Sequence, residues 1–231
     1  MTRRRSYLPA LAGGVLLTLA AARAADQTVL VEDWSRQPLG HRGIPIDWQG
    51  QNWGNPGYDM SVIIDAGRRV LRLRSPGDGS TISKDVRGTV DLQRTPILEW
   101  SWKVTTLPTG GNSCRGETDD QAIQLYVVWP RLPTAIRSRI IGYVWDSTMA
   151  VGVTCRSQTA VPAVTYVVVR SGGADLGRWL TERRNLVEDF RRIYGDGPES
   201  PAVISIASDS NDTHSTAEAF IGPIWFSAPS R

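Results

Sequence analysis

Oxygen-bearing side chains are concentrated in one short segment near the end of the chain. Asp209, Asn211, Asp212 and Thr213 supply four of them between two runs that are typical of strands. Carboxylate, amide and hydroxyl oxygens are the ligands that Ca²⁺ takes in proteins. The segment lacks the glycine and the closing glutamate of an EF-hand loop, and Asp and Asn also favour tight turns. The pattern therefore predicts either a calcium site or a structural turn.

A second group of acids stands immediately before an apolar strand. Asp119 and Asp120 follow Glu117 and precede the run Gln121 to Trp129. Paired carboxylates can hold a ligand or a metal ion, and they can serve as acid and nucleophile in glycoside cleavage. An acid at the start of a strand can also be a turn residue that binds its own backbone. We predict that Asp119 and Asp120 contact a ligand, with the turn as the alternative.

Aromatic residues two positions apart form the third group. Trp100 and Trp102 share one face of a predicted strand, and Tyr143 and Trp145 form a similar pair. Flat rings on a sheet can stack against the apolar face of a sugar ring. Large aromatics also fill the cores of β-sandwiches, where their N–H groups find partners. The four residues are thus candidates either for ligand binding or for the core.

The elements that must position these groups are mostly strands. Short runs rich in β-branched and aromatic residues alternate with turn residues along the chain. Their spacing predicts an all-β, jelly-roll-like (concanavalin- or galactose-binding-like) β-sandwich. The ten predicted strands span residues 28–34, 60–66, 69–75, 80–86, 97–104, 121–129, 139–145, 163–170, 202–208 and 217–226.

One segment has helical periodicity instead. Leu186, Phe190 and Ile193 recur at the spacing of one helix face. Asn185 can cap the N-terminus and Gly195 can end the helix in a left-handed conformation. The pattern predicts one short helix beside the sandwich.

The two cysteines flank a predicted antiparallel strand pair. Cys114 precedes the strand at 121–129, and Cys155 follows the strand at 139–145. The start of the first strand lies beside the end of the second in an antiparallel pair. Both cysteines then fall at one end of the sheet, so we predict a Cys114–Cys155 disulfide, a bond that persists in oxidising compartments.

The N-terminal residues have the pattern of an export signal. Arg3, Arg4 and Arg5 precede an apolar run, and a small-residue cleavage site ends near Ala24. The stretch "RRSYL" also resembles the twin-arginine pattern. We predict a signal peptide over residues 1–24, a single β-sandwich domain over 25–231, and a periplasmic or secreted location.

The charge of the predicted mature chain argues against a nucleic-acid partner. The leader holds four arginines and no acid, so four of the 26 basic residues are removed and 22 remain against 23 acidic residues. A nucleic-acid-binding domain usually carries a basic stripe and a high pI. No later run is long and apolar enough to predict a transmembrane segment after cleavage.

Several motifs together resemble a bacterial family, domain of unknown function 3047. They are "ILEWSWKV", "DDQAIQLYVVW", "GYVWD", "ERRNLVEDFRRIYGDGP" and "ISIASDSNDTHSTAEAFIGPIWF". The resemblance covers residues from about Val29 to Phe226 in order. It implies an exported sandwich protein and no settled activity.

The sequence leaves three functions open. The first is a non-catalytic protein of the cell envelope that binds a carbohydrate or another envelope ligand, with calcium as the one cofactor considered. The second is a glycan hydrolase or lyase that uses paired carboxylates. The third is a structural or interaction protein of the envelope.

Overall fold

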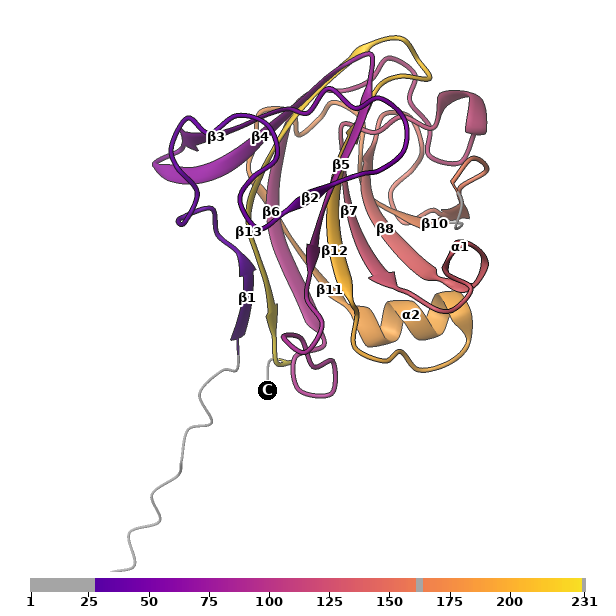
Figure 1. Cartoon of the computed structure of the whole chain (residues 1–231). Coiled ribbons are helices and arrows are strands. Elements are labelled where there is room, and N and C mark those ends of the chain that lie inside the picture. The colour runs from indigo at the N-terminus through magenta and orange to yellow at the C-terminus, as the bar shows by residue number, and fades with distance from the viewer. Residues whose placement is uncertain (1–27, 161–163, 230–231) are drawn as a thin grey trace, which may run out of the picture.

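The computed structural model describes residues 28–160 and 164–229, and the predicted leader lies outside them. Within these residues the chain forms two β-sheets that pack face to face (Figure 1). The first sheet, sheet A, has the order β11-β6-β13-β4-β3, and β1 also pairs with β13. Its strands are β1 (Thr28–Glu32), β3 (Asp59–Asp65), β4 (Arg68–Pro76), β6 (Ile97–Thr106), β11 (Leu180–Asn185) and β13 (Thr216–Ser227).

The second sheet, sheet B, has the order β2-β5-β12-β7-β8-β10-β9. Its strands are β2 (Gln49–Gly50), β5 (Gly79–Asp85), β7 (Ile123–Trp129), β8 (Arg139–Asp146), β9 (Thr154–Arg156), β10 (Val164–Ser171) and β12 (Val203–Asp209). The β-sandwich prediction is confirmed, and each of the ten predicted strands corresponds to an observed one. The short strands β2 and β9 and the polar strand β11 were not predicted.

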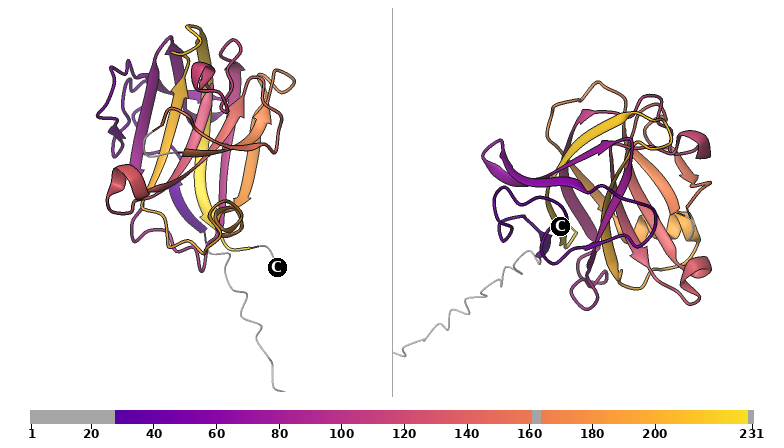
Figure 2. Two further views of the ribbon diagram at one scale, coloured as in Figure 1. Left: turned by 90° about the vertical axis from the view of Figure 1, so that its right-hand side faces the viewer. Right: turned by 45° about the horizontal axis from the view of Figure 1, so that its top comes forward.

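The alternation of side chains along the strands builds the core between the sheets. Leu125 and Ile206 of sheet B face Leu73 and Ile221 of sheet A, and all four side chains are buried. The residues between them in sheet B face the other way, because successive side chains of a strand point to opposite faces. Sheet B therefore has an inner apolar face and an outer face of different composition. Figure 2 shows the ribbon of these strands in two further views.

The aromatic pairs of the sequence lie in this core. Trp100 and Trp102 of β6 meet Tyr143 and Trp145 of β8, with ring centroids 5.2 Å apart for Trp100–Tyr143 and 6.1 Å for Trp102–Trp145. All four side chains have no exposed surface. The expectation of an exposed stacking face at these residues is therefore corrected: the shared face of β6 is the face that covers the second sheet.

The predicted helix is confirmed as α2 (Leu186–Tyr194). The Asn185 side chain accepts hydrogen bonds from the backbone N–H groups of Val187 and Glu188, and Gly195 ends the helix at φ 81°. Phe190 packs into the core against Trp129. A second helix, α1 (Thr134–Arg137), and a 3₁₀ turn at Gly116–Thr118 were not predicted. No helix in residues 28–160 and 164–229 has the length and apolarity needed to cross a membrane.

Candidate ligand-binding face

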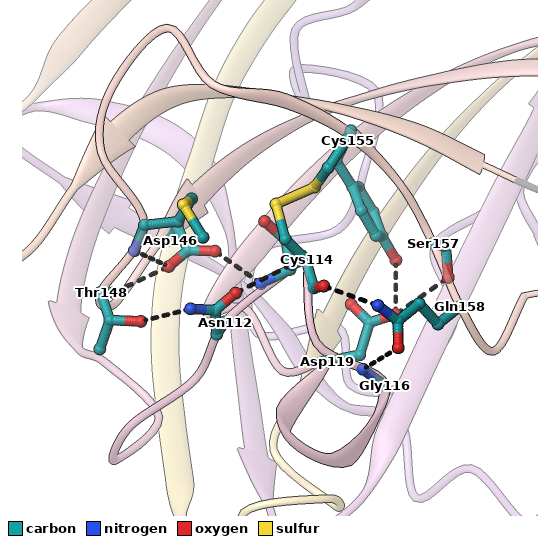
Figure 3. The surroundings of a disulfide bond; sticks show 12 residues. Asn112, Cys114, Gly116, Asp119, Asp146, Thr148, Cys155, Ser157 and Gln158 are labelled. Atoms are coloured by element: carbon teal, nitrogen blue, oxygen red, sulfur yellow. Dashed lines mark hydrogen bonds between the residues drawn. A yellow bond between two sulfur atoms is a disulfide. The ribbon is translucent and has the colours of Figure 1, made fainter.

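The predicted disulfide ties the loop before β7 to the edge strand β9 of sheet B. Cys114 and Cys155 are bonded, with their Cα atoms 5.7 Å apart. Strands β7 and β8 pair antiparallel with Ile123 opposite Trp145, as the prediction required. Around the bond, Gln158 donates to the Cys114 carbonyl oxygen over 3.0 Å and accepts from the Gly116 N–H over 3.3 Å (Figure 3). The bridge thus fixes the loop before β7 against β9.

Asp119 is a buried carboxylate that joins this loop to the sheet. Its Oδ2 atom accepts a hydrogen bond from the Ser157 hydroxyl over 3.0 Å (Figure 3). The same atom accepts from the Thr159 hydroxyl, also over 3.0 Å. Its Oδ1 atom accepts from the Gln121 amide over 3.0 Å. Burial raises the pKa of Asp119, and these hydrogen bonds oppose that rise. With so many protein donors, Asp119 acts first as a structural anchor.

Asp120 holds the loop that follows β12. Its side chain is fully buried, and its two oxygens accept the backbone N–H groups of Asp212 over 3.2 Å and Thr213 over 2.6 Å. A catalytic carboxylate must instead be free to reach a substrate. The two predicted groups, the acids before β7 and the polar loop after β12, are therefore brought together, but by contacts that hold the loop in place.

Asp209 is the carboxyl in this cluster whose proton affinity is most altered. Burial, together with the nearby carboxylates of Asp120 and Asp212, raises the pKa of Asp209 to about 8. Burial likewise raises the pKa of Asp212, with the charge of Asp120 as the next cause. Asp209 is thus largely protonated at neutral pH and can donate a hydrogen bond as well as accept one.

Three of the four predicted metal ligands hydrogen bond to one another within the loop. The Asp209 Oδ1 atom accepts the Asn211 N–H over 3.3 Å, and the Asn211 amide donates to Asp212 over 2.8 Å. No group of three or more His, Cys, Asp or Glu side chains suited to a metal ion occurs in the part of the chain that the structure describes. The calcium site stays a prediction.

A row of polar and small residues crosses the outer face of sheet B. Neighbouring strands place Ser83 of β5 beside Ser205 of β12, Ser205 beside Tyr126 of β7, and Tyr126 beside Gly142 of β8. The hydroxyls of Ser83 and Ser205 are 2.8 Å apart. We call Ser83, Ser205, Tyr126 and Gly142 the outer row. The β8 end of the outer face, by contrast, packs against the connection between β8 and β10, through residues such as Met149 and Val153.

Gly142 allows the Tyr126 ring to lie across the sheet. A Cβ atom added to Gly142 would stand 2.8 Å from the Tyr126 Cε1 atom and 2.9 Å from its Cδ1 atom. Only glycine leaves room for the ring there. Tyr126 donates to the Gln124 side chain, which in turn donates to Gln121 over 2.5 Å. The ring is therefore held in one orientation, part-buried, with hydrogen-bonding amides beside it.

Trp53 adds an exposed ring near the other edge of sheet B. Its side chain is 61% exposed, the most of the nine tryptophans. The loop that carries it is fastened to β5, because the Gln51 side chain accepts the Thr81 N–H over 2.7 Å and donates to the Trp53 carbonyl oxygen over 3.0 Å. Strand β5 is two strand spacings, roughly 10 Å, from the strand of Tyr126.

Sequence reasoning missed the residues of this outer face. The alternation in "QAIQLYVVW" separates Gln124 and Tyr126 from the apolar residues Ile123, Leu125 and Val127. That alternation was available as a signal for a polar outer face. Nothing in the sequence marks Trp53 as the exposed tryptophan, since its exposure depends on the path of the loop.

The fold is thus that of a two-sheet β-sandwich whose second sheet has a partly polar outer face. A family model described as "Protein of unknown function (DUF3047)" matches residues 47–225. The chain belongs to this family, as the sequence motifs suggested. No curated protein matches the chain.

Solved structures with similar folds include two family 30 carbohydrate-binding modules. One has a TM-score of 0.47 and 12% identity over 89% of each chain. The other, from a cellulosomal cellulase of Clostridium thermocellum, has a TM-score of 0.45 and 13% identity, over 89% of this chain and 99% of that one. The xyloglucanase domain of NopAA from Sinorhizobium fredii follows, with a TM-score of 0.44 and 11% identity over 78% and 92%. At these identities the likeness concerns the fold alone.

Proposed function

We propose that this protein is an exported envelope protein that binds a carbohydrate on the outer face of sheet B without turning it over. The observation that carries the proposal is the Tyr126 ring, held across Gly142 by hydrogen bonds within a row of hydroxyls and amides. Sugars present both apolar ring faces and many hydroxyls, so an aromatic ring beside fixed donors and acceptors suits them.

Two neighbouring groups support the same class of ligand. Trp53 supplies an exposed ring, and amphipathic aromatics are common in binding surfaces. Asp209, protonated at neutral pH, supplies a hydrogen-bond donor at the end of β12 without adding a charge. Export is supported by the Cys114–Cys155 disulfide, since such bonds persist in oxidising compartments.

The rival function is glycan cleavage, and one observation favours it. A carboxyl with a raised pKa beside a second carboxyl is the arrangement from which glycosidases work, and Asp209 stands beside Asp120. Against it, both Asp120 oxygens accept backbone N–H groups of the loop. Release of reducing ends from soluble glycans by the wild type, abolished in Asp209→Asn, would replace the binding proposal with this one.

A glycan panel tests the proposal. The oxidised protein lacking residues 1–24 is applied to the panel in calcium and again in chelator, beside Trp53→Ala and Tyr126→Ala. Ile64→Ala serves as the control, because Ile64 is an apolar side chain 51% exposed on sheet A. We expect a hit that both aromatic variants weaken about tenfold or more and that the control retains.

The comparison of binding in calcium with binding in chelator distinguishes the contacts of the outer row from a calcium site. A hit that survives the chelator supports the aromatic and hydroxyl contacts alone. A hit lost in chelator supports the calcium site predicted at Asp209, Asn211, Asp212 and Thr213. The absence of any hit, or a hit that both aromatic variants retain, contradicts the proposal and favours a protein partner in the envelope.

A further inference from the structure

The structure also contains a groove that is lined by arginines, away from the outer row. Arg139 begins β8 and lies opposite Trp129, the last residue of β7, whereas Asp119 and Asp120 stand before the first residue of β7. The groove and the acidic loops are thus at opposite ends of β7. Figure 1 shows α1 and α2 at the groove's end of sheet B.

The groove has the size of a small-molecule site and a basic lining. Its volume is about 620 Å³, within the usual range for ligand sites. It is lined by Ile136, Arg137, Ser138, Arg139, Thr154, Cys155, Arg156, Thr165, Arg192, Ile193 and Tyr194. Four of these residues are arginines and none is acidic.

Sheet register explains why the arginines converge. Arg156 of β9 lies opposite Thr165 of β10, and paired residues on adjacent strands point to the same face. Tyr166 and Val168 point to the outer face, so Thr165 and Arg156 point to the inner face. Helix α2 packs on that inner face, and its last turn brings Arg192 and Tyr194 to the groove.

Two of the arginines are fixed and partly neutralised. Arg139 forms an ion pair with Asp196, and its guanidinium carbon lies 4.8 Å from the centroid of the Tyr194 ring. Arg192 forms an ion pair with the buried Asp189 over 2.7 Å. These contacts hold two guanidinium groups in place before any ligand arrives.

The other two arginines carry uncompensated charge. Arg137 and Arg156 are exposed, and neither forms an ion pair within residues 28–160 and 164–229. Arg156 is fixed through its chain neighbour, because Cys155 is bonded to Cys114. A groove with two unpaired guanidinium groups and two fixed ones attracts an anion that accepts several hydrogen bonds.

We propose that this groove binds a phosphoryl group. Guanidinium forks match the oxygens of phosphate in bidentate fashion, and a phosphate offers more acceptor oxygens to several arginines than a single carboxylate does. Ser138, Thr154 and Thr165 add hydroxyls to the same lining. The groove is separate from the outer row, so the phosphoryl proposal does not depend on the carbohydrate proposal.

Calorimetry with inorganic pyrophosphate and inorganic phosphate tests the site. The oxidised protein is compared with Arg137→Gln/Arg156→Gln, and with Arg36→Gln, which removes the same kind of charge from a side chain 86% exposed elsewhere. We expect binding that the double variant weakens about tenfold or more, that the control retains, and that weakens as salt is added.

A vesicle arm identifies the source of the phosphoryl group. Cosedimentation is measured with phosphatidylglycerol vesicles and with phosphatidylcholine vesicles. Binding to phosphatidylglycerol vesicles that the double variant loses assigns the groove to a lipid headgroup, and binding to pyrophosphate alone assigns it to a free ligand. Failure of the wild type to bind any of these probes, or equal binding by the double variant, overturns the proposal.

Because both arginines are exposed, we expect the double variant to keep the wild-type melting temperature. The two single variants measure the contribution of each arginine to binding separately.

Discussion

The space between the two sheets and the outer face of sheet B both contain aromatic rings, but in different settings. Trp100, Trp102, Tyr143 and Trp145 are enclosed by two sheets and have no exposed surface. Tyr126 lies over a glycine on the outer face, and Trp53 projects from a loop. The comparison shows that a spacing of two residues identifies rings on the same face of a strand. Whether those rings belong to the core or can contact a ligand depends on the segments that cover that face.

The largest expected difference between the core rings and the outer-face rings is in their contribution to the free energy of unfolding. Trp102→Ala should lower the free energy of unfolding by about 3–5 kcal/mol, because it leaves a cavity and removes one hydrogen-bond donor to the Glu182 side chain. Tyr126→Ala should cost less, because the Tyr126 ring is only part-buried, in a smaller cluster on the outer face, and is not enclosed between the two sheets. Urea denaturation of both variants measures the two losses in the free energy of unfolding. Equal losses would show that Tyr126 is also a core residue.

Removal of the disulfide should have the next largest effect. Cys114→Ser/Cys155→Ser opens a loop with a sequence separation of 41, and such bonds are typically worth about 2–4 kcal/mol. The same change should release the hydroxyls of Ser157 and Thr159 from Asp119. Denaturation in the oxidised and reduced states provides the measurement, and an unchanged midpoint in the double variant would argue that the loop is held without the bond.

The pH dependence of stability should reveal the ionisation of Asp209. Its pKa rises from 3.8 to about 8 on folding, so the folded state binds more protons than the unfolded state between these values. Stability contributed by this group therefore falls as the pH rises from about 4 to about 8. Asp209→Asn should remove that slope and exceed the wild type in stability by about 1 kcal/mol or more at pH 8. Parallel pH profiles for the two proteins would contradict this.

The smallest expected effect concerns the helix at the end of the core. Asn185→Ala removes the acceptor of two backbone N–H groups and should cost about 1 kcal/mol. Asn185→Ser, which retains a capping oxygen, should restore most of that loss. Thermal denaturation of the two variants compares them, and an equal loss in both would mean that Asn185 acts through its contact with Glu188 instead.

Local patterns in the sequence were sufficient for most of the fold. Runs rich in β-branched and aromatic residues between turn residues identified ten of the strands, and helical spacing with capping residues identified α2. Strand β11 was missed because "LTERRN" is almost entirely polar, and its pairing with β6 is a long-range contact. Strands β2 and β9 are too short to show a period.

The candidate site was less accessible to sequence reasoning. The proximity of Asp119 and Asp120 to the loop after β12 follows from the pairing of β7 with β12, which local patterns do not reveal. The same limit applies to the arginines of the groove, which come from β8, β9, α1 and α2. The disulfide was predictable from the antiparallel pairing of β7 and β8, although Cys155 lies in the unpredicted strand β9.

The indole N–H signals in a ¹H–¹⁵N spectrum test the central claim most directly. The glycan identified by the panel is titrated into the labelled, oxidised protein, and Trp53→Phe assigns the Trp53 signal. Our account predicts that the Trp53 signal shifts on binding, whereas the signals of Trp100, Trp102 and Trp145 stay in place. A spectrum in which the buried tryptophans shift and Trp53 does not would contradict it.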